Sequence, residues 1–134
     1  MRVSNFTLWA LLAGLCLLPM HAVAAPAYEC QLAEVFECTA TAGCKKASAQ
    51  DNDLPPAVTL NVKEKNLFSG LFGGEGMLES GDVYEDENVL IMHGRRQLQT
   101  WTAVVNKVTG AYSGSVSQLG KTFAQFGTCV ANES

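Results

Sequence analysis

The pattern that most restricts the fold of this chain is the absence of helical periodicity beyond residue 24. No long stretch there repeats its apolar positions every three or four residues, as an amphipathic helix does. Short segments instead alternate apolar and polar side chains, most clearly Val58, Leu60 and Val62 with their polar neighbours. This period of two is that of a strand with one buried and one solvated face. The sequence therefore predicts an all-β protein.

Predicted turns separate the predicted strands. Residues 98–106 are rich in Thr, Trp and Val, and a hairpin turn over residues 107–110 places Gly110 in the left-handed conformation. Residues 41–53 and 93–96 are interpreted as a loop and a turn. The alternation over residues 28–40 places on one face Tyr28, Cys30, Leu32, Phe36 and Cys38. We expect a small antiparallel barrel or sandwich of seven to eight strands, with meander connections.

The first 24 residues have the parts of a secretory signal peptide. An arginine precedes the uncharged, apolar residues 6–18, and Ala22 and Ala24 supply the small residues that signal peptidase recognises. The apolar run is shorter than the about 20 residues of a membrane-spanning helix. A signal anchor and a lipoprotein that begins at Cys16 are the alternatives. We expect cleavage after Ala24, which leaves a single β domain over residues 25–134 with no transmembrane span.

The remaining residues contain four cysteines, Cys30, Cys38, Cys44 and Cys129. An even number behind a signal peptide indicates two disulfides and an oxidising compartment, hence a periplasmic or secreted protein. Of the three pairings that four cysteines allow, we favour Cys38–Cys44 as a local clip and Cys30–Cys129 as a bridge between the two ends. Zinc binding is the alternative, but the spacing lacks the closely spaced cysteine pairs of structural zinc sites.

Few residues suit catalysis. His93 is the one histidine beyond residue 24, no serine lies in a Gly-x-Ser-x-Gly motif, and disulfide-bonded cysteines supply no thiolate. The acidic run at Glu85, Asp86 and Glu87 fits neither a spaced glycosidase pair nor a calcium loop, and is interpreted as a solvated turn. The formal net charge of −4 is opposite in sign to that of nucleic-acid-binding domains. We predict a non-catalytic binding module without metal or cofactor.

An apolar, glycine-rich segment over residues 67–72 is a candidate for partner binding through Phe68 and Phe72. One interpretation is an exposed tip that docks on a protein or a lipid surface. The other is a plug that closes one end of the barrel, which is favoured because a small domain needs its large apolar side chains inside. Trp101 has the same two interpretations, and burial is favoured for it as well.

The cysteine frame resembles that of small secreted proteobacterial proteins of unestablished function. The resemblance covers both ends of the chain and rests on Tyr28-x-Cys30, Cys38-x5-Cys44 and the terminal Gly127-Thr128-Cys129. It implies a compact β structure and no particular activity.

A shorter motif is similar to that of the periplasmic inhibitors of C-type lysozyme. Ser80, Gly81 and Tyr84 match a Ser-Gly-x-x-Tyr sequence, which in that family lies on the loop that enters the lysozyme cleft. The family's Trp-Lys-Gly turn has no counterpart here, and the cation that accompanies it would have to be Arg95 or Arg96. The sequence thus predicts a binding module whose partner is another protein or a cell-wall component. The alternatives are a lysozyme-inhibitor-like protein and a structural or stress-related envelope protein.

Overall fold

The computed structural model describes residues 27–47, 57–69, 77–78 and 81–132, and the regular structure in them is entirely β. The strands are β1 (Ala27–Thr39), β2 (Gly43–Ala47), β3 (Ala57–Asn61), β4 (Asn66–Ser69), β5 (Met77–Leu78), β6 (Val83–Glu85), β7 (Val89–Arg96), β8 (Gln99–Asn106), β9 (Ala111–Gln118) and β10 (Lys121–Asn132). Of these strands, only β5 and β6 have fewer than four residues. The predicted all-β class with about eight principal strands is confirmed. The predicted signal peptide, Phe72 and Ser80 lie outside the described residues.

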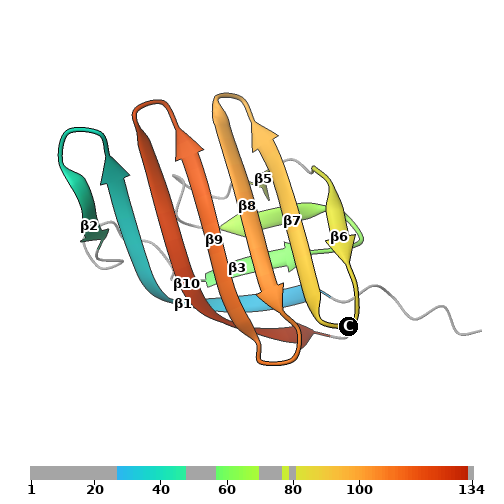
Figure 1. The fold of residues 1–134 in the computed structure, drawn as a ribbon. Helices are drawn as coiled ribbons and strands as arrows, with labels where there is room; N and C mark the ends of the chain where they lie inside the picture. Colours follow the sequence, from blue (N-terminus) through green and yellow to red (C-terminus); the bar gives the residue numbers. More distant parts are fainter. Residues whose placement is uncertain (1–26, 48–56, 70–76, 79–80, 133–134) are drawn as a thin grey trace, which may run out of the picture.

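The strands form one antiparallel sheet that curls into a half-barrel, with β3 and β4 behind the long strands β7 to β9 (Figure 1). Their order is β5-β4-β3-β1-β10-β9-β8-β7-β6, and β2 pairs with β1 outside this path. The two longest strands, β1 and β10, pair along their whole length and connect the two layers. The first part of β1 pairs with β3, and its last part pairs with β2.

An irregularity in β1 inverts the alternation that the sequence predicted. The register against β10 shifts between Leu32 and Glu34, so that one extra residue lies between the two parts of the strand. Cys30 is buried in the core, whereas Phe36 and Cys38 belong to the opposite, outer face. The prediction of one continuous face is therefore wrong beyond Leu32, because a single inserted residue moves every following side chain to the other side.

The core lies between the two layers of the curled sheet. It is built from buried side chains of the rear layer and of the long front strands, namely Tyr28, Cys30, Val58, Leu60, Leu67, Leu90, Met92, Trp101, Ala103, Val105, Tyr112, Val116 and Cys129. The burial of Trp101 confirms its predicted core position. Disulfides join Cys30 to Cys129 inside this core and Cys38 to Cys44 across the β1–β2 hairpin. Both predicted pairings are confirmed.

Two hairpins extend further than the sequence predicted. β7 continues through residues 93–96, and the chain turns only at Gln97, whose φ is 50°. β2 occupies residues 43–47, which were interpreted as part of a loop. Pairing across the hairpin, such as Gly94 opposite Trp101, overrides the weak local preference of these polar stretches. The predicted turn at Gly110 is confirmed, with φ of 75°.

Candidate functional site

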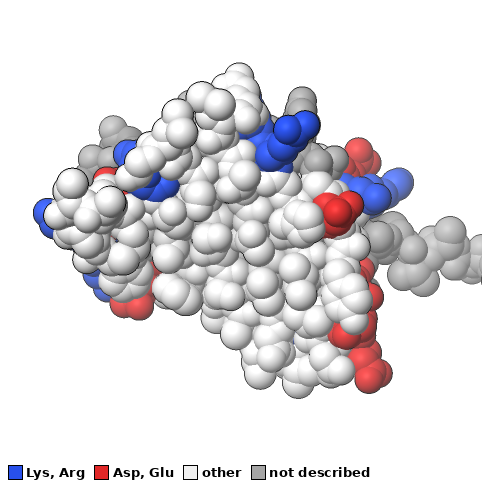
Figure 2. Space-filling view, turned by 45° about the horizontal axis from the view of Figure 1, so that its top comes forward, with Lys and Arg blue, Asp and Glu red and all other residues white. Residues whose placement is uncertain are grey.

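The outer face of β8, β9 and β10 carries no charged side chain. Trp101, Ala103 and Val105 point inward from β8 and are buried, so the alternate residues of that strand point outward. The cross-strand pairs extend this outer face over its neighbours, and its members are Thr100, Thr102, Val104, Asn106, Ala111, Ser113, Ser115, Ser117, Thr122, Ala124, Phe126 and Thr128. Figure 2 shows a broad uncharged area, with the charged residues gathered at its margins.

The strand register aligns hydroxyl groups into rows across this face. Ser115 on β9 stands opposite Thr102 on β8, and Ser117 stands between Thr100 and Thr122. The hydroxyl oxygens of Ser117 and Thr122 are 3.0 Å apart and share a hydrogen bond. Adjacent strands of a sheet lie about 4.8 Å apart, so the rows form a regular ladder. Since each hydroxyl both donates and accepts, the ladder can bind a hydroxyl-rich ligand without any ion pair.

Aromatic side chains border the hydroxyl rows. Phe126 is 46% exposed and packs edge-on against Phe36 of β1, with ring centroids 6.3 Å apart. On the other side lies β7, with His93 and Arg95 opposite Thr102 and Thr100, and beyond it Tyr84 of the edge strand β6 is 58% exposed. Tyr84 stands opposite Ile91, and Ile91 stands opposite Val104, so apolar surface leads from the sheet edge toward the centre. Such rings combine a large apolar surface with a preferred stacking geometry.

The predicted lysozyme-binding motif lies at the edge of the same sheet, and its residues Gly81 and Tyr84 are described. Gly81 lies directly against β7, since a Cβ there would collide with the backbone carbonyl of His93. The backbone of Asp82 accepts a hydrogen bond from the His93 N–H at 3.2 Å. The Asp82 carboxylate lies 3.8 Å from His93 Nε2, and both side chains are exposed. The glycine of the motif is thus explained by close packing on β7.

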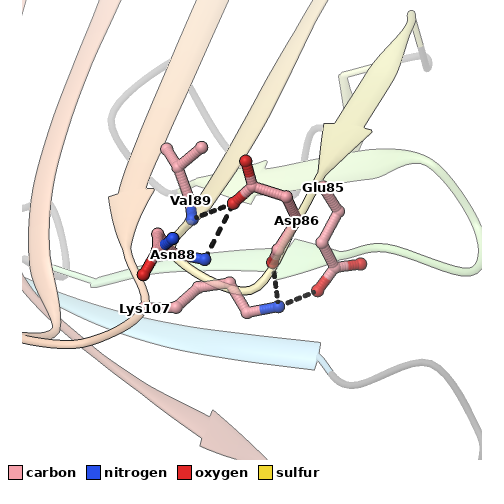
Figure 3. A network of polar contacts seen from close by, with 5 residues as sticks. All are labelled: Glu85, Asp86, Asn88, Val89 and Lys107. Atoms are coloured by element: carbon pink, nitrogen blue, oxygen red, sulfur yellow. Dashed lines mark hydrogen bonds and ion pairs between the residues drawn. The ribbon is translucent and has the colours of Figure 1, made fainter.

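Asp86 and Glu87 of the acidic run lie in the turn between β6 and β7, as predicted, whereas Glu85 ends β6 and is partly buried against Lys107. Asp86 Oδ1 accepts hydrogen bonds from the backbone N–H groups of Asn88 at 2.7 Å and Val89 at 2.8 Å. Lys107, from the turn between β8 and β9, donates to Glu85 Oε1 at 2.9 Å and to the backbone oxygen of Asp86 at 2.7 Å (Figure 3). These contacts tie two neighbouring turns together at one end of the sheet.

The hydrogen bonds of this turn shift the ionisation of its charged groups. The two backbone N–H donors lower the pKa of Asp86, and the hydroxyl of Tyr84, 3.2 Å from Oδ2, acts in the same direction. The hydrogen bond to Glu85 raises the pKa of Lys107. Both shifts favour the charged forms, so the network is a stabilised turn in which the carboxylate keeps its charge.

A polar pair lies on the inner face, within the core. The buried hydroxyl of Tyr112 donates to Gln125 Oε1 at 3.0 Å, and burial raises the pKa of this tyrosine. Gln125 Nε2 is buried without a hydrogen-bond partner among the described residues. This pair was not predicted from the sequence, because a glutamine in an alternating strand is expected on the solvated face.

Of the apolar segment over residues 67–72, the structure describes residues 67–69. Leu67 is buried in the core, which agrees with the plug interpretation for this residue. Phe68 is exposed on the opposite face of β4. Phe68 stands opposite Thr59 and Met77, whereas Tyr84 stands opposite Ile91, so the two aromatic residues belong to different strand pairs.

The uncharged outer face was not predicted, although the sequence contains a signal for it in the spacing of its charged residues. Between Gln97 and Asn132, the only charged residues are Lys107 and Lys121, and both flank turns. Serines occupy alternate positions at residues 113–117. A solvated strand face normally carries charged residues, so this gap in charge marks an unusual surface.

Comparison with known proteins found no matching family model, no matching curated protein and no matching solved structure. Within the described part of the chain, no group of His, Cys, Asp and Glu side chains is placed to hold a metal ion. The same residues include no helix with the length and apolar character needed to cross a membrane. The candidate site therefore rests on the geometry of the sheet itself.

Proposed function

We propose that this protein is a secreted or periplasmic binding module without catalytic chemistry, whose ligand is an uncharged glycan of the cell envelope. The ligand lies across the outer face of β8, β9 and β10. The observation that carries the proposal is the uncharged, hydroxyl-bearing character of that face, which Phe126 ends on the β10 side.

The chemistry of the face suits a neutral polyhydroxylated ligand. No ion on the face must lose its hydration when the ligand binds, so the large desolvation cost of a buried charge does not arise. Serine and threonine side chains are short and lose little rotamer freedom on binding. Strands also hold their side chains more precisely in position than loops do. The sheet curls with its core on the concave side, and the convex outer face is suited to an extended polymer.

The arrangement of the titratable groups supports binding rather than catalysis. A general base must be oriented and within hydrogen-bond reach of its proton. His93 and Asp82 are 3.8 Å apart, and both are solvated. Asp86 and Lys107 are engaged in the turn between β6 and β7. The four cysteines are joined in disulfides, which leaves no thiolate among them to act as a nucleophile.

The disulfides also bear on location. Two of them are consistent with an oxidising environment outside the cytoplasm. Together with the signal-peptide pattern of the first 24 residues, they support a periplasmic or secreted protein. A protein in either place meets envelope glycans directly.

Glycan binding is tested by sedimentation of the purified protein with insoluble chitin, cellulose and peptidoglycan. We expect one of these to retain the wild type, and we expect Ser115→Glu to weaken retention at least about tenfold, because the ligand would bury an unpaired charge. Val108→Glu is the matched control, since it adds the same charge at an exposed turn outside the face. Retention of Ser115→Glu at wild-type strength would refute the proposal. So would a dimer in solution that Ser115→Glu dissociates, which would make this face a self-interface.

A second candidate function is inhibition of a C-type lysozyme, and the exposure of Tyr84 beside an acidic turn at the sheet edge favours it. The acidic turn would attract a basic enzyme. We expect Ser80→Ala or Tyr84→Ala to weaken inhibition at least about 30-fold, as for an interface hot spot, and we expect salt to weaken it further. Phe68→Ala, which removes another exposed aromatic side chain, is the control. An assay of cell-wall lysis that shows no inhibition by micromolar wild-type protein would eliminate this candidate.

A further inference from the structure

Two neighbouring hairpin turns at one end of the sheet carry exposed leucines. Leu98 lies in the turn between β7 and β8 and is 73% exposed, and Leu119 lies in the turn between β9 and β10 and is 80% exposed. Gln99 Nε2 donates to Gln118 Oε1 at 2.9 Å and joins the two hairpins just below their tips. The β8–β9 register ends at Thr100 opposite Ser117, and continuing it by two residues places Leu98 opposite Leu119. The two leucines therefore protrude side by side.

Turn chemistry does not explain these leucines. Two-residue turns favour Asn, Asp and Gly because their backbone adopts positive φ. Gly120 supplies this conformation beside Leu119, with φ of 82°, while Gln97 adopts φ of 50° beside Leu98. A leucine at such a position gains no burial within the domain and exposes apolar surface to water. Residues that violate a local rule without a gain in stability are candidates for function.

Basic residues flank the leucines. Arg95 and Arg96 end β7, and both are exposed, with the uncharged Thr100 and Gln99 as their cross-strand partners. Lys121 begins β10, and it contacts Glu37 at 3.8 Å and the Phe123 ring at 5.2 Å. Figure 2 shows basic residues at this end of the molecule.

We propose that this tip surface, formed by Arg95, Arg96, Leu98, Leu119 and Lys121, docks on an anionic lipid bilayer. The leucines enter the region between headgroups and acyl chains, and the cations bind the headgroup phosphates. A bilayer is favoured over an acidic protein because the tips are narrow and protruding, whereas a protein interface needs roughly 800 Å² of complementary surface on each partner.

The charge distribution favours the same orientation. The acidic turn at residues 85–87 lies at the far end of the eight-residue strand β7, about 25 Å from the tips at the rise of an extended strand. The Debye length at physiological ionic strength is about 8 Å, so the acidic end does not repel a bilayer that contacts the tips. Arg95, Arg96 and Lys121 outnumber Glu37 at the tip surface, whereas Glu85, Asp86 and Glu87 outnumber Lys107 at the other end. This asymmetry would bring the protein to an anionic surface with the tip surface first.

The proposal is tested by sedimentation with vesicles of phosphatidylcholine, alone or with phosphatidylglycerol replacing part of it. We expect the full-length mature protein to bind the anionic vesicles and to be released by salt. Arg95→Gln with Arg96→Gln should weaken binding about 30-fold, which corresponds to about 1 kcal/mol per cation. Leu98→Ser with Leu119→Ser should weaken it at least about tenfold.

The matched control for the leucines is Val108→Ser, which changes a side chain with 74% exposure in the turn at the opposite end of β8. Absence of vesicle binding, equal binding to neutral vesicles, or an equal loss in Val108→Ser would overturn the proposal. Binding of polyglutamate at the same strength, independent of the leucines, would also overturn it and would indicate an acidic protein partner. Ser115→Glu should leave vesicle binding unchanged, so the glycan proposal and this one fail separately.

Discussion

The two faces of the long strands β8 and β9 differ more than alternation alone requires. The inner face buries Trp101, Ala103 and Val105 in the core, and the outer face carries short hydroxyl side chains in register on neighbouring strands. Within the eight residues of β8, the odd-numbered side chains therefore stabilise the core, and the even-numbered ones form the outer surface. Because burial of the inner residues supplies most of the stabilisation, the residues of the outer face can vary with little effect on folding.

The largest expected effect separates the two faces directly. Trp101→Ala should lower the free energy of unfolding by about 3–5 kcal/mol, because it leaves a cavity in the core. Thr102→Ala, the next residue on the outer face, should change it by no more than about 0.5 kcal/mol. Urea unfolding followed by far-UV circular dichroism measures both. A comparable loss in the two variants would contradict the division of roles between the faces.

The two disulfides differ in burial and in the length of chain that they close. Cys30–Cys129 lies in the core and joins residues 99 apart in sequence, whereas Cys38–Cys44 joins residues 6 apart at a hairpin. Replacing Cys30 and Cys129 by alanine should cost about 2–5 kcal/mol. Replacing Cys38 and Cys44 should cost about 2 kcal/mol less than that, since a short loop loses less chain entropy when it is closed. The midpoints of urea unfolding of the two double variants measure the difference, and the reverse order would contradict it.

Tyr112 and Gln125 form a polar pair within the otherwise apolar inner face. Gln125→Leu should cost about 1–3 kcal/mol, because it leaves the buried Tyr112 hydroxyl without its acceptor. Adding Tyr112→Phe should recover much of this loss, since both polar groups are then gone. A double-mutant cycle in urea measures the coupling, and additive costs would show that the hydrogen bond does not stabilise the core.

The smallest expected effect concerns the acidic turn. The pKa of Asp86 is lowered in the folded protein, so its contribution to stability is present above the ordinary value of 3.8 and is lost as the pH falls through the lowered value. Asp86→Asn should remove this step from the dependence of unfolding free energy on pH. Urea unfolding at a series of acid pH values measures it. Glu87→Gln, next to the turn network, is the control, and an acid step retained in Asp86→Asn would contradict the assignment.

The candidate site was only partly predictable from the sequence. The motif at Ser80, Gly81 and Tyr84 was visible as a string of letters, and the structure explains its glycine by packing against the backbone of His93. The outer face was not predicted, because its hydroxyl rows combine Ser115 of one strand with Thr102 of another. Leu98 and Leu119 are 21 residues apart in the sequence, and only the strand register shows that they lie side by side.

The β class, the turn at Gly110 and the number of disulfides follow from the sequence, because alternation, turn chemistry and cysteine number are local or countable properties. The pairing of the cysteines was one choice among three, and the structure confirms it. Three features could be seen only in the folded structure. They are the position of the register shift in β1, the side of the sheet on which Phe36 lies, and the surfaces without charge. The physical reason is that strand register and sheet curvature arise from pairing between residues distant in the chain. A shift of one position in that pairing exchanges the buried and the exposed face without changing the local sequence.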